Sequence, residues 1–251
     1  MKLYLEMLKK PVFTLEDAMS VGVSSGTIKN QLVKLVTDGY VERIRRNLYT
    51  CISPETKLPI ANKYQIASAI TKDSFASHHS ALEYYGVADQ VYYDVYVSSK
   101  TKFQNFDYNG YTYKCILVKK NMGVAKPVMK DGICVSSPER AVVESIKDMD
   151  KISGVEEVIA SIVLFPMLDE NKMLECLEGF DNQFLYQKVG FIMEHFKEQF
   201  SISDDFIAIC KDKAGQSKRY FTKDMKCTIW NREWKIVIPE KLFEMKNGEN
   251  V

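Results

Sequence analysis

Histidine and closely spaced cysteine are scarce in this sequence of 251 residues, which has three histidines and six cysteines but no C-x-x-C pair. A structural zinc site needs four such ligands at close spacings, so we expect reduced, buried thiols and no metal. No apolar run approaches the ~20 residues of a membrane span, and the N-terminus lacks the apolar core of a signal peptide. We therefore expect a cytoplasmic protein.

Enzyme fingerprints are also missing. The sequence contains no G-x-S-x-G, no P-loop and no dinucleotide-binding glycine motif, so we expect no catalytic residue and no cofactor. Hydrophobic residues make up 46% of the chain, which is enough to bury a sizeable core and excludes disorder as its main state.

The charges nearly cancel but are unevenly distributed. Lys and Arg number 34 against 33 Asp and Glu, a balance that neither favours nor excludes nucleic acid as a partner. Residues 1–50 hold eight basic and five acidic side chains, whereas residues 139–181 hold four basic and eleven acidic ones. A late stretch, residues 211–226, holds six basic and two acidic side chains. The chain is therefore polarised along its length.

The first fifty residues carry the pattern of a winged helix-turn-helix. Thr14 followed by Asp17 resembles a capping box that opens a second helix. A third helix begins near Ser24 or Ser25, and Gly39 ends it. Apolar residues at helical spacing predict one buried stripe on this third helix, namely Ile28, Leu32, Leu35 and Val36.

The opposite side of the third helix is polar and is the predicted DNA-reading surface. Short polar side chains allow close approach to base edges, and an Asn amide pairs bidentately with adenine. The hairpin that follows, residues 40–50, resembles a wing whose arginines reach phosphate or the minor groove. The predicted DNA-binding residues are Ser24, Ser25, Thr27, Lys29, Asn30, Lys34, Arg43, Arg45 and Arg46. The alternative is a winged helix that binds only protein.

The remaining two hundred residues mix helix and strand. Asn109-Gly110 predicts a hairpin between strands over 105–108 and 111–118. Helices are predicted over 61–70, over 77–85, from Pro138, and through most of 154–196, with strands from about Ser201 onward. We therefore expect an α+β fold: a winged helix-turn-helix over 1–52, a linker over 53–62, and a larger mixed α/β C-terminal domain over 63–251 with a sub-boundary near residue 199.

Two local patterns bear on chemistry. His78 and His79 diverge by about 100° on a helix and cannot both ligate one ion, so we expect a helix-entry role beside Tyr84 and Tyr85. Glu233-Trp234-Lys235 has the E-x-K spacing of metal-dependent nucleases, but the sequence offers no obvious partner Asp. The basic stretch 211–226 is either a solvated surface or a contact for DNA beside the operator, or for a nucleic-acid substrate.

Four short motifs occur in a fixed order. They are R-I-R-R-N-L-Y at 43–49, S-H-H-S-A-L-E-Y-Y-G at 77–86, S-P-E-R-A-V-V-E at 137–144, and K-V-G-F-I-M-E at 188–194. This ordered set resembles AbiEi-type antitoxins and covers most of the chain. Asn47 stands where that family usually has Gly, and Glu144 where it usually has Asp.

The resemblance implies a DNA-binding transcriptional repressor that is the antitoxin of a type IV toxin-antitoxin system, as in abortive infection. It implies autoregulation through operator DNA with inverted repeats, and a nucleotidyltransferase-like toxin counteracted without required direct contact. It implies neither an enzyme nor a membrane partner. The alternatives are an ordinary winged-helix regulator with a ligand- or protein-binding C-terminal domain, and a metal-dependent nuclease.

Overall fold

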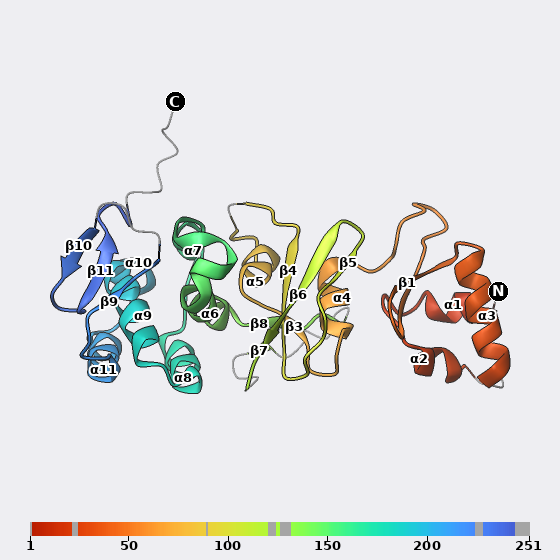
Figure 1. Ribbon diagram of the computed structural model, residues 1–251, viewed down its shortest axis with the longest axis horizontal. Coiled ribbons are helices and arrows are strands. Elements are labelled where there is room, and N and C mark those ends of the chain that lie inside the picture. The colour runs from red at the N-terminus through yellow and green to blue at the C-terminus, as the bar shows by residue number, and fades with distance from the viewer. Residues whose placement is uncertain are drawn as a thin grey trace, which may run out of the picture. The chain divides into compact units, whose positions relative to one another are not determined.

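The structure is a computed structural model that describes residues 2–21, 25–88, 90–119, 124–125, 132–223 and 228–243. The chain forms two compact units, the first made of residues 1–76, 93–119 and 125–135, and the second of residues 77–92, 120–124 and 136–251. Both units contain helices and strands (Figure 1), which confirms the predicted α+β fold class.

The elements as far as β8 are α1 (Lys2–Met7), α2 (Leu15–Met19), α3 (Ser25–Thr37), β1 (Val41–Arg45), β2 (Leu48–Cys51), α4 (Lys63–Ala69), β3 (Phe75–Ala76), α5 (His79–Tyr84), β4 (Asp94–Ser99), β5 (Phe106–Tyr108), β6 (Tyr111–Leu117), β7 (Val124–Ala125) and β8 (Val135–Ser136). Those that follow are α6 (Pro138–Ile152), α7 (Gly154–Ile162), α8 (Glu170–Phe180), α9 (Gln183–His195), α10 (Lys197–Phe200), α11 (Asp204–Lys213), β9 (Arg219–Tyr220), β10 (Thr228–Asn231) and β11 (Ile236–Pro239).

Helices α1 to α3 and the hairpin β1–β2 form a winged helix-turn-helix. The predicted capping box opens α2, where the Thr14 hydroxyl accepts a bond from the backbone N–H of Asp17 at 3.2 Å. Phe13 exchanges two 2.9 Å backbone bonds with Tyr49 and so forms an isolated antiparallel β-bridge to the wing. The core of this part of the chain is made of Leu3, Tyr4, Met7, Phe13, Ala18, Ile28, Leu32, Leu35, Val41 and Cys51.

The buried stripe of α3 is narrower than predicted. Ile28, Leu32 and Leu35 are buried, but Val36 is 36% exposed, so its prediction as a core residue is wrong. The reason is its position about 80° from Ile28 around the helix, at the rim of the apolar side.

A six-stranded sheet of order β5-β6-β4-β3-β8-β7 follows. β4 and β6 pair in parallel, and β5 and β6 form the antiparallel hairpin predicted from Asn109-Gly110. Both turn residues have positive φ, 49° for Asn109 and 78° for Gly110, as this tight turn requires. Asn62 caps the start of α4, and its side chain accepts bonds from the N–H groups of two residues in the first turn of that helix.

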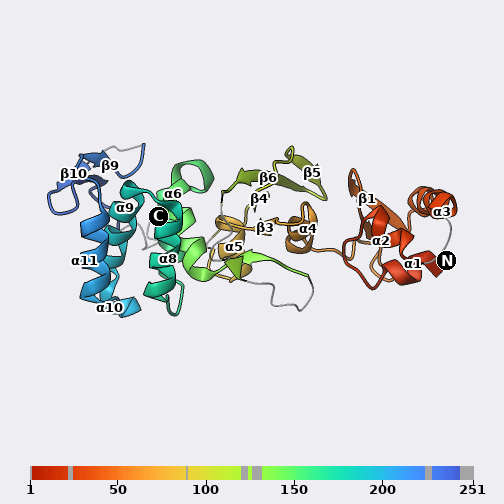
Figure 2. The ribbon, with the colours of Figure 1, turned by 90° about the horizontal axis from the view of Figure 1, so that it is seen from below.

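The second unit is mainly helical. Ser137 caps α6 with Pro138 as its first residue, as predicted. α9 and α11 lie side by side (Figures 1 and 2), and the unit ends in a small sheet of order β10-β11-β9. The prediction of only strands after Ser201 is wrong, because Ser203 caps α11 and acidic residues in its first turn favour the helix start. No helix among the described residues is long and apolar enough to cross a membrane.

Candidate nucleic-acid interface

The polar side of α3 is exposed along its length. Ile28 and Leu32 face the core, and this orients Lys29, Asn30 and Lys34 outward. Within the described part of the chain, none of these three side chains is engaged in an ion pair or hydrogen bond. They are therefore available to a ligand.

Val33 belongs to the same exposed side and was not predicted. It is 66% exposed, one helical turn from Asn30 and next to Lys34. An apolar group in this position can contact the methyl group of thymine. Its place on the helix, about 140° from Ile28, indicates an exposed position. The sequence-based prediction omitted Val33 because only polar residues were considered on that side.

The other predicted residues of α3 are placed as follows. Thr27 is exposed in the first turn of the helix. Ser25 is its first residue, and its side chain lies outside the described atoms. Ser24 lies outside the described residues.

The three wing arginines do not have the same surroundings. Arg43 and Arg46 are exposed, and the Arg43 Nε donates to the carbonyl of Arg45 at 3.3 Å. The Arg45 guanidinium instead lies over two aromatic rings, 5.5 Å from the centroid of Phe103 and 5.0 Å from that of Phe106. The structure therefore leaves two of the three arginines turned to solvent.

Arg45 is one of two wing contacts to the β5–β6 region. The Tyr108 hydroxyl donates to the Glu42 carboxylate at 2.7 Å. Burial and this hydrogen bond to a carboxylate both raise the pKa of Tyr108, so the phenol keeps its proton at neutral pH. The wing is thus bound on one side through Glu42 and Arg45.

Asn47 fixes the tip of the wing. Its φ of 59° lies in the left-handed region, which Asn tolerates better than other residues with a side chain. Its side-chain oxygen also accepts a 3.0 Å bond from the N–H of Leu15 at the start of α2. The side chain therefore ties the wing turn to the helix-turn-helix, which glycine at this position could not do.

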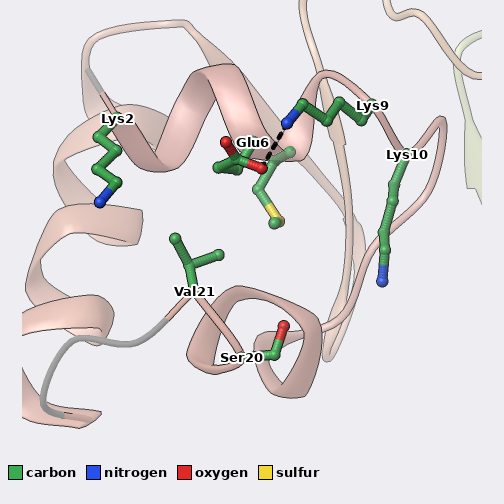
Figure 3. A pocket seen from close by; sticks show the side chains of 7 residues that line it. Lys2, Glu6, Lys9, Lys10, Ser20 and Val21 are labelled. Carbon is green, nitrogen blue, oxygen red and sulfur yellow. Dashed lines mark hydrogen bonds and ion pairs between the residues drawn. The ribbon is translucent and has the colours of Figure 1, made fainter.

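A hollow of about 400 Å³ lies between α1 and the end of α2 (Figure 3). Lys2, Lys9 and Lys10 are among its lining residues. Lys9 is paired with Glu6 at 2.8 Å, and Lys10 is paired with Asp17. Because two of these three cations are already neutralised, we assign no ligand to the hollow.

Two of the four sequence motifs, residues 77–86 and 137–144, contact each other in a buried network in the second unit. The Glu144 carboxylate of α6 accepts bonds from the backbone N–H of His78 at 2.8 Å, from the Arg140 Nε at 3.1 Å and from the Ser136 hydroxyl. His78 has a φ of 54° and a ψ of −135°, a strained conformation for a residue with a side chain. Glu144 thus anchors the entry of α5, which is a structural role.

Asp148 extends this network by one helical turn. Burial alone would raise its pKa, but hydrogen bonds from His78, Lys147 and Lys151 hold the pKa of Asp148 well below its usual range. The neighbouring His79 is buried and contacts Glu157 at 3.0 Å through its Nε2. The histidines lie in separate interactions, and among the residues described no group of His, Cys, Asp and Glu could hold a metal ion.

The E-x-K pattern lies in a turn and not on a strand, since β11 begins only at Ile236. Glu233 is ion-paired with Lys211, and Lys235 donates to Gln216. Between them Trp234 is buried, and its indole N–H donates to Glu194 at 2.6 Å. These residues anchor the small sheet to α9 and do not form the carboxylate cluster of a nuclease.

Comparisons with known proteins agree with this geometry. Residues 3–50 match the model of a family described as transcriptional regulator, AbiEi antitoxin. The crystal structure of the Rv2827c protein from Mycobacterium tuberculosis has a similar fold, with a TM-score of 0.64, 12% identity, and coverage of 94% of this chain and 88% of that one. No curated protein matches the chain in sequence. The similarity to this family of transcriptional regulators thus lies in the N-terminal segment that contains the winged helix-turn-helix.

Proposed function

We propose that this protein is a DNA-binding repressor that regulates its own operon and is the antitoxin of a type IV toxin-antitoxin system. The observation that carries the proposal is the exposed polar side of α3, next to exposed wing arginines, in a segment that matches a family of antitoxin regulators. Its functional partner would be a nucleotidyltransferase-like toxin, with direct contact not required.

In this proposal α3 enters the major groove of an operator with inverted repeats. Asn30 reads an adenine, and Val33 contacts a neighbouring thymine methyl group, so the pair favours A·T base pairs. Lys29 and Lys34 lie on the flanks of the helix, where cations meet phosphates. Thr27 and the serines at the helix start complete the approach, with Arg43 and Arg46 on the backbone or in the adjacent minor groove.

DNA binding is tested with the region upstream of the protein's own gene, by fluorescence anisotropy at several salt concentrations. Asn30→Ala should lose about 1–3 kcal/mol of discrimination between operator and scrambled duplex. Equal discrimination by Asn30→Ala and the wild type would refute the assignment of α3 as the reading helix.

The adjacent wing arginines provide a matched pair. Arg46→Ala should reduce the slope of log K against log salt by about 0.9 for each lost phosphate contact. Arg45→Ala should leave the slope unchanged, because its guanidinium lies over Phe103 and Phe106. A reduced slope for Arg45→Ala together with an unchanged slope for Arg46→Ala would show that Arg45, and not Arg46, contacts phosphate.

The antitoxin role is tested separately, in cells that express the neighbouring toxin. A full-length chain carrying Asn30→Ala and Arg46→Ala should lose repression of a reporter but still rescue growth, if the second unit counteracts the toxin. Loss of rescue together with repression would show that repression is the whole antitoxin effect.

A further inference from the structure

One side of the small sheet in the second unit carries two exposed aromatic side chains. In the sheet register Tyr220 of β9 is paired with Val237 of β11, which is paired in turn with Trp230 of β10. Directly paired residues point to the same side of a sheet, so these three side chains form one row. We call this row, together with Lys218, the aromatic face.

The side of the sheet opposite the aromatic face is turned toward α9 and the core. Phe221 follows Tyr220 and is fully buried, while Ile236 and Ile238 flank Val237 and are also buried. Arg219, on the same side as Ile236, lies over the ring of Phe184 in α9. The opposite side therefore carries the outward row.

Both rings of the aromatic face are exposed. Tyr220 is 61% exposed and Trp230 is 45% exposed, whereas Val237 between them is only 5% exposed. The Lys218 Nζ lies 5.9 Å from the centroid of Tyr220 and 5.3 Å from that of Trp230. A cation thus sits between two exposed rings on a sheet surface.

The surroundings of the aromatic face are basic. The described residues of 213–243 include seven basic and two acidic side chains. One of these two acidic residues, Glu233, is already paired with Lys211. The field at this surface therefore favours a polyanion over an acidic or neutral protein surface.

We propose that the aromatic face binds single-stranded nucleic acid, with one base stacked on Tyr220, another on Trp230, and Lys218 on the phosphate between them. Aromatic rings on a basic sheet surface are suited to unpaired bases, since every base presents a flat π surface. Base pairs in a duplex have both surfaces stacked already. This site lies apart in the chain from α3, and it goes beyond operator binding.

The spacing of the rings supports two separate bases. Tyr220 and Trp230 are two strands apart, about 9.6 Å at the usual strand separation. One base sandwiched between parallel rings would need only about 7 Å, twice the stacking distance of ~3.4 Å. Lys218 lies within reach of both rings, so it can move to a phosphate when the bases arrive.

The chain supplies its own probe for this site. It has two tryptophans, of which Trp234 is buried and Trp230 is exposed. A base stacked on Trp230 should quench the exposed component of the fluorescence. The full chain is titrated with oligo(U), with oligo(dT), with a mixed-sequence duplex of the same length, and with inorganic polyphosphate. Quenching and binding by the single strands, but not by polyphosphate or the duplex, are the expected results.

The variants separate stacking from charge. Trp230→Ala and Tyr220→Ala should each weaken binding of the single strand about 5- to 150-fold, and Trp230→Phe should weaken it less. Lys218→Gln should lower the salt slope by about 0.7, the value for one phosphate contact on a single strand. Tyr93→Ala removes a 72% exposed ring in the first unit and should change nothing.

Three results would overturn the proposal. Affinity unchanged in both ring variants would exclude stacking. Equal binding of duplex or polyphosphate would reduce the face to a plain cationic surface. Loss of self-association in Trp230→Ala, with no binding of either single strand by the wild type, would make the face an interface between copies.

Tighter binding of oligo(U) than of oligo(dT) would assign the aromatic face to RNA. Because Asn30→Ala leaves this face intact, failure here and failure of operator binding remain distinguishable.

Discussion

Gly190→Ala tests how the small sheet is held to the helices of the second unit. A Cβ atom at Gly190 would lie 2.2 Å from Cη2 and 2.5 Å from Cζ3 of Trp234, and 2.7 Å from the Cβ of Cys210. Ordinary contacts are 3.4–4 Å, so both neighbours would have to move, Trp234 by about 1 Å. Neither is a flexible side-chain end, because Trp234 is a rigid buried ring and the Cys210 Cβ is fixed to α11.

The expected change in the free energy of unfolding follows from two opposing effects. Alanine in a helix is favoured over glycine by about 1 kcal/mol, which alone would stabilise the variant. Overpacking a rigid core costs about 1–3 kcal/mol and occasionally more, and two clashes well under 3 Å belong at the upper end. We therefore expect Gly190→Ala to lower the free energy of unfolding by about 2 kcal/mol.

Tryptophan fluorescence during urea unfolding measures this change in the relevant unit, because both tryptophans belong to the second unit. Gly26→Ala is the matched control: Gly26 also lies in a helix, α3, but its added Cβ would meet nothing within 4 Å. Far-ultraviolet circular dichroism should show this control to be neutral or stabilised. A Gly190→Ala variant as stable as the wild type would refute the tight packing of Trp234 against α9.

A double-mutant cycle identifies the partner. Trp234→Phe removes the fused ring system that the new Cβ would strike, at the cost of the indole bond to Glu194. If the clash is with Trp234, the double variant should be less destabilised than the sum of the single variants, by about 0.5–3 kcal/mol as is usual for residues in contact. Strict additivity would place the strain at Cys210 instead.

The remaining predictions concern the buried network and the wing. Glu144→Ala should destabilise the second unit by about 3–5 kcal/mol in urea unfolding, because it leaves the Arg140 charge buried without this carboxylate, whereas exposed Glu178→Ala should stay within about 0.5 kcal/mol. Because the pKa of Asp148 is lowered in the folded protein, its carboxylate stabilises the fold above the unfolded pKa of about 3.9, and this stability is lost as the pH falls below that value. Asp148→Asn should therefore make the free energy of unfolding fall less steeply with decreasing pH in this acidic range. An equally steep fall in the variant would contradict this. Asn47→Ala should melt at a lower temperature than Asn47→Gly, by the equivalent of about 1 kcal/mol, because only glycine adopts the left-handed φ without cost; equal melting would exclude strain at the wing tip.

Features whose cause lies within a few residues were predictable from the sequence. The capping box at Thr14, the hairpin turn at Asn109-Gly110 and the Ser137-Pro138 start of α6 are each determined by local hydrogen bonding and φ preferences. The exposed side of α3 was predictable for the same reason, because helical periodicity places Asn30 and Lys34 opposite Ile28. The start of α11 at Ser203 carried the same kind of signal, but the strands that follow in β9 to β11 dominated the interpretation of that region.

Features that depend on distant residues were not predictable. Nothing near Arg45 in the sequence indicates that Phe103 and Phe106, about sixty residues later, supply the rings beneath its guanidinium. The aromatic face depends in the same way on register, since Tyr220 and Trp230 meet only through Val237. The basic stretch 211–226 was noted for its charge alone, and its neighbouring rings become visible only when the strands pair.

The different roles of the wing arginines follow from one irregularity in β1. With regular alternation Val41 and Ile44 would face opposite sides, yet both are buried, at 1% and 6% exposure. The register shifts between Arg43 and Arg45, where one extra residue enters the strand, and such a bulge re-aims the side chains that follow it. Arg43 precedes the shift and is exposed, whereas Arg45 follows it, lies on the same side as Glu42 and contacts Phe103 and Phe106. The same shift that holds the wing in place thus removes one of its three arginines from the solvent-exposed surface.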